Sequence, residues 1–299
     1  MRAFLPTLVA AGLIASAASG AASAPVVLAK IRVAPATAPC AAAGGGGFVW
    51  VSDYSAPFLL KINPRTNKVV KKVGIGHGSC GLGFGAGSLW IEDTQSNTIS
   101  RVSAATGKRI AAVKVGLQPY DATFAYGAAW ATSYGNGEVD RIDPGRNTVV
   151  KRFRLGSSIG VVGAFGSIWA TGVQGVIRID PATNKVIATI PVESAGWTAA
   201  SGDAVWITTS SSLVRIEPST NTVAATIKLA SVTVGDPGVV GGQVWVPLIR
   251  ENAIAVVDPS SNTVVQTVKV GAGPFVVTEI AGEAWVPSWK GADIWRLKP

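Results

Sequence analysis

The chain has 299 residues, of which 48% are hydrophobic and 14% are charged, so a large core is available. Its two Cys and one His exclude a zinc site, which takes about four such ligands. The formal net charge of +9 favours an anionic partner or surface but carries no information about the fold. The length alone permits two domains.

The first residues are typical of an export signal. Met1 and Arg2 form a short basic start, residues 3–18 are mostly apolar, and Ser19–Ala24 are small residues suited to cleavage. The apolar run is shorter than the ~20 residues that a spanning helix needs, which disfavours an uncleaved anchor. We therefore expect a signal peptide over residues 1–24, with its cleavage position open, and a secreted or periplasmic protein.

One tryptophan recurs along the rest of the chain at spacings of 40, 40, 39, 37, 39 and 40 residues: Trp50, Trp90, Trp130, Trp169, Trp206, Trp245 and Trp285. In six copies a Gly stands three residues earlier, between two short apolar runs, which is typical of a hairpin turn. The pattern predicts a first strand before the Gly and a second strand that carries the Trp.

A polar loop and a third strand follow in each copy, for example Phe58–Ile62 in the first. Most third strands end in an acidic or amide residue and Pro, with Asn three residues after the Pro, as in Asn63, Pro64 and Asn67. Such an Asn readily adopts the left-handed conformation of a turn. A fourth strand follows, for example Val69–Val73. Four antiparallel strands in each of seven copies predict an all-β, seven-bladed β-propeller over residues 25–299.

The two chain ends complement each other. The seventh copy stops after its third strand, Ile294–Leu297, and the N-terminus supplies a spare strand, Val26–Val33. Val33 precedes Trp50 by 17 residues, just as Val73 precedes Trp90. We therefore expect Val26–Val33 to be the outer strand of the last blade and to close the ring.

Cys40 and Cys80 each lie ten residues before a repeat Trp, at equivalent positions in adjacent blades. Innermost strands converge near the axis of a propeller, so the two residues come within the ~7 Å between Cα atoms that a disulfide allows. An exported protein also meets an oxidising compartment. We expect a structural Cys40–Cys80 disulfide, the alternative being two buried thiols.

The loops between blades and the loops after each repeat Trp open on one face, and they vary most in sequence. They carry four aspartates at paired positions: Asp53 and Asp93 follow a repeat Trp by three residues, and Asp121 and Asp236 precede one by nine. Converging carboxylates hold Mg²⁺ or Ca²⁺ through their oxygens. Solvated acids or turn caps are the alternative, since no defined metal loop is present.

Aromatic residues on the same loops predict a platform for a sugar, a peptide or a flat small molecule: Tyr54, Tyr120, Tyr134, Trp197, Phe275 and Trp289. Packing between blades is the alternative for the residues that depart from the repeat. The repeat tryptophans themselves are expected in the core. His77, the only histidine, is either a general base or a solvated loop residue.

Basic residues recur just before the third turn, at Lys61, Arg101, Arg141, Arg178, Arg215 and Arg296. Their period predicts a structural role, either pairing with the nearby acid or covering apolar surface. Further basic residues gather at Lys68, Lys71, Lys72, Lys108, Arg109, Lys151, Arg152 and Arg154. These residues suit an anionic polymer. Nucleic acid is not expected, because aromatic side chains are not interleaved with them.

Three repeat units, Val49–Ser52, Ala129–Thr132 and Val205–Thr208, with turns such as Ile179–Val186, resemble the YVTN-type bacterial propeller repeat. They are equally similar to the streptogramin (virginiamycin B) lyase-like propellers. The resemblance covers nearly all of the mature chain. It implies a fold and, for the lyases, the opening of a cyclic depsipeptide by elimination with a His, a Glu and bound magnesium. We do not match His77 to that catalytic histidine.

The leading interpretation is a secreted, monomeric propeller that binds a small molecule, peptide or glycan through its variable face, without catalysis and without a resident cofactor. One alternative is a streptogramin-lyase-like enzyme assisted by Mg²⁺ or Ca²⁺. Another is a scaffold held on an anionic cell-wall polymer by its positive charge.

Overall fold

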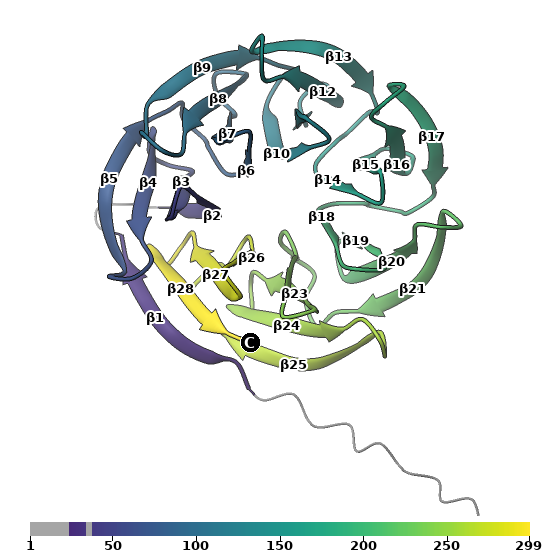
Figure 1. The fold of residues 1–299 in the computed structure, drawn as a ribbon. Coiled ribbons are helices and arrows are strands. Elements are labelled where there is room, and N and C mark those ends of the chain that lie inside the picture. The colour runs from purple at the N-terminus through teal and green to yellow at the C-terminus, as the bar shows by residue number, and fades with distance from the viewer. Residues whose placement is uncertain (1–23, 34–37) are drawn as a thin grey trace, which may run out of the picture.

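Seven four-stranded antiparallel sheets surround a central axis, one strand of each sheet lying next to the axis and one at the circumference (Figure 1). The structure is a computed structural model that describes residues 24–33 and 38–299. The expected all-β, seven-bladed propeller is confirmed. The expected signal peptide lies almost entirely outside the described residues.

The first three blades follow one another along the chain, and each runs from the axis outward. Blade 1 contains β2 (Pro39–Gly45), β3 (Phe48–Asp53), β4 (Phe58–Asn63) and β5 (Lys68–Gly74). Blade 2 contains β6 (Leu82–Gly85), β7 (Ser88–Asp93), β8 (Thr98–Ser103) and β9 (Arg109–Lys114). Blade 3 contains β10 (Pro119–Ala125), β11 (Ala128–Ser133), β12 (Glu138–Asp143) and β13 (Thr148–Arg154).

The next three blades repeat the same order. Blade 4 contains β14 (Val161–Ala164), β15 (Ser167–Gly172), β16 (Gly175–Asp180) and β17 (Lys185–Ile190). Blade 5 contains β18 (Thr198–Ala200), β19 (Val205–Thr208), β20 (Ser212–Glu217) and β21 (Thr222–Lys228). Blade 6 contains β22 (Gly238–Val240), β23 (Gln243–Leu248), β24 (Ala253–Asp258) and β25 (Thr263–Lys269).

Blade 7 is built from both ends of the chain. It contains β26 (Thr278–Ile280), β27 (Glu283–Ser288), β28 (Asp293–Lys298) and, as its outer strand, β1 (Val26–Arg32) (Figure 1). Strand β1 pairs antiparallel with β28, and Ile31 lies opposite Ile294. Ile31 and Val33 are buried in a cluster that also contains Val49 of blade 1. The expected closure by the N-terminal strand is therefore confirmed, with the strand ending at Arg32.

The repeat tryptophans form the core between blades, as expected, and none is more than 1% exposed. In the first four blades the indole Nε1 also donates to the carbonyl five residues earlier, for example from Trp50 to Gly45 at 3.0 Å. This bond ties the second strand to the preceding hairpin turn. Burial and the turn bond together explain why one Trp recurs where the rest of the sequence varies.

The recurring arginines bind the following blade rather than the acid in their own turn. Arg141 Nη1 donates to the carbonyl of Pro181 at 2.7 Å and to Oδ1 of Asn184 at 2.6 Å. Arg101, Arg178, Arg215 and Arg296 make the same pair of bonds, which we call the inter-blade clasp. Each of the five guanidinium groups also lies over the repeat Trp of its own blade.

The structural role expected for these basic residues is thus confirmed, but the expected pairing with the nearby acid was wrong for the clasp. The acceptors are a proline carbonyl and the Asn of the turn. That Asn has positive φ in all five turns, between 54° and 58°, as its turn position predicted. No helix in the described residues is long and apolar enough to cross a membrane.

Candidate functional site

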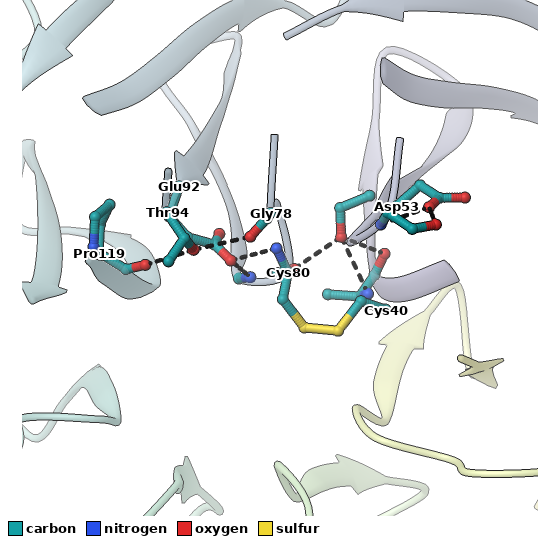
Figure 2. Close-up of a disulfide and its surroundings, with 11 residues drawn as sticks. Cys40, Asp53, Gly78, Cys80, Glu92, Thr94 and Pro119 are labelled. Carbon is teal, nitrogen blue, oxygen red and sulfur yellow. Dashed lines mark hydrogen bonds between the residues drawn. A yellow bond between two sulfur atoms is a disulfide. The ribbon is translucent and has the colours of Figure 1, made fainter. Parts of the chain in front are cut away.

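A disulfide between Cys40 and Cys80 joins blades 1 and 2 near the axis, with Cα atoms 5.0 Å apart (Figure 2). Cys40 lies at the start of β2, and Cys80 lies two residues before β6. Both residues are buried. The disulfide expected from the equivalent register of the two cysteines is therefore confirmed.

The inner strands of all seven blades surround a central cavity of about 330 Å³, which we call the channel. At its lining lie residues such as Ala41, Gly81, Asp121, Asp236 and Val276. Small residues predominate, because seven inner strands converge there and leave little room. The two aspartates at equivalent positions thus line one shared cavity, the arrangement in which converging carboxylates were weighed against solvated acids.

Six aromatic side chains form a continuous series of ring contacts, which we call the aromatic collar: Tyr134, Tyr120, Trp197, Phe275, Trp289 and Tyr54. Trp197 lies 5.2 Å from Tyr120, nearly parallel to it, and 5.2 Å from Phe275, nearly perpendicular. The separations of the other neighbouring centroids run from 5.9 to 6.3 Å. All six platform residues are thus brought together, although they come from blades 1, 3, 5 and 7 and their flanking loops.

A pocket of about 130 Å³ lies within the collar. It is lined by Tyr54, Tyr120, Phe275 and Trp289 together with both cysteines of the disulfide. Trp197 is 8% exposed and contacts two of the rings that line the pocket, Tyr120 and Phe275, whereas Tyr54 is 41% and Tyr134 51% exposed. The disulfide therefore forms part of a pocket wall, a role that its structural interpretation missed.

Asp121 is buried at the channel, and both of its carboxylate oxygens accept backbone N–H groups. Oδ1 accepts from Ala122 at 2.7 Å, and Oδ2 accepts from Val161 of the next blade at 2.9 Å. Burial nevertheless raises the pKa of Asp121 to about 6. Loss of solvation, followed by the nearby Asp121 charge, raises the pKa of Asp236 well above its ordinary value. The two carboxyls therefore act as an electrostatically linked pair.

Glu92 is a buried acid beside the disulfide (Figure 2). Its Oε1 accepts the N–H groups of Cys80 and Gly81, and its Oε2 has no partner among the described residues. Burial raises the pKa of Glu92 well above its ordinary value, against the lowering effect of those N–H groups. Glu92 lies in strand β7 and is not among the site residues that the sequence predicted. Its position in a strand, two residues after a repeat Trp, is the signal that was missed.

Asp53 and Asp93 do not face the channel cavity. They close strands β3 and β7, and both are fully buried. Asp93 accepts hydrogen bonds from Gly76, Ser79, Thr98 and Ser100 within its own blade and its entry loop. Asp53 accepts two from Ser55. The expected loop position was wrong for both residues, because the second strand extends three residues past the Trp.

The described residues contain no group of three or more His, Cys, Asp or Glu side chains arranged to hold a metal ion. His77 is exposed and lies outside both the pocket and the channel lining. The described residues therefore offer no ready-made cluster of three such ligands for Mg²⁺ or Ca²⁺. What the site offers is an apolar ring-sized pocket above a pair of carboxyl groups.

These features define a seven-bladed β-propeller with an aromatic pocket at one end of its channel. Solved structures share this fold. A streptogramin B lyase structure matches with a TM-score of 0.78 and 16% identity over 90% of this chain and 96% of that chain. Virginiamycin B lyase from Staphylococcus aureus matches with a TM-score of 0.78 and 15% identity over 91% and 98%.

Hydrazine synthase from Kuenenia stuttgartiensis also matches, with a TM-score of 0.75 and 15% identity over 89% of this chain and 96% of that chain. No family model matches the sequence, and no curated protein matches it. Proteins with very different names therefore share this architecture. At these identities the likeness shows the fold, and it confirms the resemblance to lyase-like propellers at that level.

Proposed function

We propose that the protein binds a ring-bearing ligand, either a small molecule or the aromatic or sugar ring of a peptide or glycan, in the aromatic collar. The observation that carries the proposal is the unbroken series of five contacts that joins six aromatic rings beside one pocket. The rings lie at recurring loop positions: Tyr54, Tyr134 and Trp289 each follow a repeat Trp by four residues, and Tyr120 and Phe275 precede one by ten. Blades 2, 4 and 6 carry no aromatic residue at either position, so the rings gather at one part of the face instead of recurring in every blade.

The size of the pocket limits what enters it. A cavity of about 150 Å³ accommodates benzene, so a pocket of about 130 Å³ takes one six-membered ring. Tyr120 and Trp289 offer apolar faces for stacking, and the half-exposed Tyr54 and Tyr134 widen the contact at the rim. The rest of a larger ligand would lie on the surrounding loops.

The direct test is binding of 2-phenylethanol, a neutral single-ring probe, measured by saturation-transfer NMR and calorimetry. We expect the Phe275→Ala and Trp289→Ala variants to weaken binding at least about tenfold, because each removes a pocket wall. Tyr126→Ala is the matched control, since Tyr126 is an exposed tyrosine at the turn between β10 and β11. Equal binding by all variants, or none by the parent protein, would refute the proposal.

Export of the mature protein is part of this proposal. A disulfide is consistent with an extracellular or periplasmic location, where such bonds persist. The sequence over residues 1–24 has the composition of a cleavable signal. N-terminal sequencing of the protein recovered from the culture medium or periplasm tests this point. A full-length chain retained in the cytoplasm would contradict it.

Lyase activity is the second candidate, supported by the shared fold and by buried carboxyl groups whose pKa values are raised. The described residues contain no group of three His, Cys, Asp or Glu ligands for the metal that such chemistry uses in the resembling lyases, so we derive no step through a metal. Incubation with a streptogramin B antibiotic, followed by mass spectrometry, tests the candidate. Ring opening that requires the protein would favour an enzyme over a binding protein.

Association with an anionic cell-wall polymer is the third candidate. Lys68, Lys71 and Lys72 lie on the exposed outer strand β5, and Lys151 lies on β13. Two other members of the basic group are engaged, since Arg152 binds Asp140 at 2.7 Å and Arg154 lies 3.6 Å from Glu138. Salt-dependent retention on teichoic acid, lost in a Lys71→Ala/Lys72→Ala variant, would support this role.

A further inference from the structure

The pocket in the collar lies directly above the channel. Tyr120, Trp197 and Phe275 of the collar each immediately precede a residue that lines the channel, namely Asp121, Thr198 and Val276. Cys40 and Cys80 in the pocket wall likewise precede Ala41 and Gly81. A ligand whose ring occupies the pocket therefore has its next atoms at the level of the channel lining.

The channel lining next to the pocket contains two acidic side chains and, among the described residues, no basic one. Asp121 and Asp236 line it, and the lining contains no Lys, Arg or His among the described residues. Repulsion between the two groups is one cause of the raised pKa of Asp236. A positive charge placed between them would relieve that repulsion and favour the ionised form of both.

Some oxygen atoms at this part of the channel also accept no hydrogen bond from the described residues. The Asp236 carboxylate has no hydrogen bond to any described residue, whereas Asp121 is fixed in place by Ala122 and Val161. Thr198, which is 7% exposed and lines the same channel, has a hydroxyl oxygen without a partner in the described chain. This hydroxyl is an observation independent of the acids: a buried polar group beside the channel whose hydrogen bonding is incomplete in the described chain.

We infer that the ligand carries an ammonium group joined to its ring through one or two carbon atoms and seated in the channel between Asp121 and Asp236, beside Thr198. The inference deepens the proposed function and rests on it. An ammonium group supplies three donors and no acceptor, which complements a lining of acceptors. The faces of the collar rings add favourable cation–π attraction at the entrance.

A divalent metal fits the same place less well. Calcium takes six to eight oxygen ligands, and the channel supplies two carboxyl groups, one of which already accepts two backbone N–H groups. The described residues offer no three-ligand cluster to hold such an ion. A single positive charge, on an ammonium group or a delocalised cation, needs only the two carboxylates and one further acceptor oxygen.

Three probes with one ring and different charges test the inference: phenethylamine, 2-phenylethanol and 3-phenylpropionate. Calorimetry at pH 7.5 with the intact protein should give affinities in that order, with phenethylamine at least about tenfold tighter than 2-phenylethanol. Asp236→Asn should remove that preference, because it should weaken phenethylamine binding far more than 2-phenylethanol binding. Glu193→Gln is the matched control, since Glu193 is an exposed carboxylate outside the channel lining on the same face.

The possible outcomes distinguish the ammonium site from the ring-binding function on which it rests. Equal binding of phenethylamine and 2-phenylethanol, both lost in Phe275→Ala, would overturn the ammonium site and leave the ring-binding function standing. Loss of the preference in Glu193→Gln as well as in Asp236→Asn would also overturn the site, because general surface charge would explain it. Binding of Ca²⁺ alone, removed by Asp236→Asn, would replace the ammonium site by a metal site. No binding by any probe would refute both proposals.

Discussion

Arg296 Nη1 donates to Oδ1 of Asn67 at 3.1 Å, although the two residues are 229 positions apart in the chain. The bond is the inter-blade clasp between the last blade and the first. It repeats, across the junction where the chain ends meet, the contact that Arg101, Arg141, Arg178 and Arg215 make inside the ring. Closure of the propeller therefore uses the same side-chain chemistry as its interior, in addition to the pairing of β1 with β28.

The clasp is missing at two junctions, for a reason visible at each. Lys61 takes the arginine position in blade 1, and the turn that follows in blade 2 has neither Pro nor Asn. Val256 takes it in blade 6, and the blade that follows has no third turn, because its outer strand comes from the N-terminus. The arginine occurs only where its acceptors exist.

We expect Arg296→Ala to lower the free energy of unfolding by about 2 kcal/mol, since it removes charge-assisted hydrogen bonds across the junction to Pro64 and Asn67 together with the ion pair to Glu283 in its own blade. Thermal and urea denaturation followed by circular dichroism measure the change. Lys298→Ala, which removes an exposed cation from the same strand, serves as the control. Equal stability of the two variants would show that the clasp does not contribute to closure.

Ile31→Ala tests the closing strand itself. Ile31 is 4% exposed between blades 7 and 1, and its truncation should cost about 2–5 kcal/mol through lost burial and a residual cavity. Its neighbour Arg32 is exposed, so Arg32→Ala should change stability by less than about 0.5 kcal/mol. A small effect of Ile31→Ala in urea denaturation would mean that β1 is dispensable.

Removing the disulfide should affect both stability and binding. Cys40 and Cys80 are separated by 40 residues, for which the loss of chain entropy predicts a stabilisation of about 4 kcal/mol. We expect the Cys40→Ser/Cys80→Ser variant to unfold at lower urea and to bind 2-phenylethanol more weakly, because both cysteines line the pocket. Unchanged binding in a folded variant would exclude the disulfide from the ligand contact.

Stability should fall as the pH rises from about 4 to about 6. The pKa of Asp121 is about 6 in the folded protein and near its ordinary 3.8 when unfolded, so the native state holds the proton more tightly in that interval. The raised pKa values of Asp236 and Glu92 act in the same direction. Asp121→Asn should flatten the profile measured by urea denaturation, by on the order of 3 kcal/mol at most. A profile that rises with pH in both proteins would contradict the assignment.

Glu92 should be replaceable by Gln but not by Ala. Ser52 and Thr132, at the equivalent position, donate to the carbonyls of Cys80 and Ile159 in the next blade. When it is protonated, Glu92 would have a hydroxyl to donate to the equivalent carbonyl, that of Tyr120, and the amide of Gln would offer the same donor. We expect Glu92→Gln to retain stability and Glu92→Ala to lose about 1–3 kcal/mol, measured by urea denaturation. Comparable losses in both would refute the donor role.

Much of the architecture could be predicted from residues that recur at regular intervals along the sequence. Seven tryptophans give the blade count, and the register of Val33 against Val73 gives the closing strand. The cysteines and the collar aromatics could be paired because equivalent positions near the axis converge. The sequence did not predict the hydrogen bonds that Asp93 accepts within blade 2 and its entry loop. Nor did it predict that Arg141 donates a hydrogen bond to Asn184 in the next blade. Those partners depend on how the blades lie against one another, which no local period encodes.

The pairing of Val26 with Lys298 places the two ends of the folded chain side by side. A short Asp-Pro-x-x-Asn linker between them would make the seventh blade covalently like the others, and new termini could then open at any outer turn. With Val256→Arg the rejoined blade would also acquire the missing clasp. In a circularly permuted chain of this kind any blade could come first in the sequence, because a closed ring of equivalent blades has no fixed starting point.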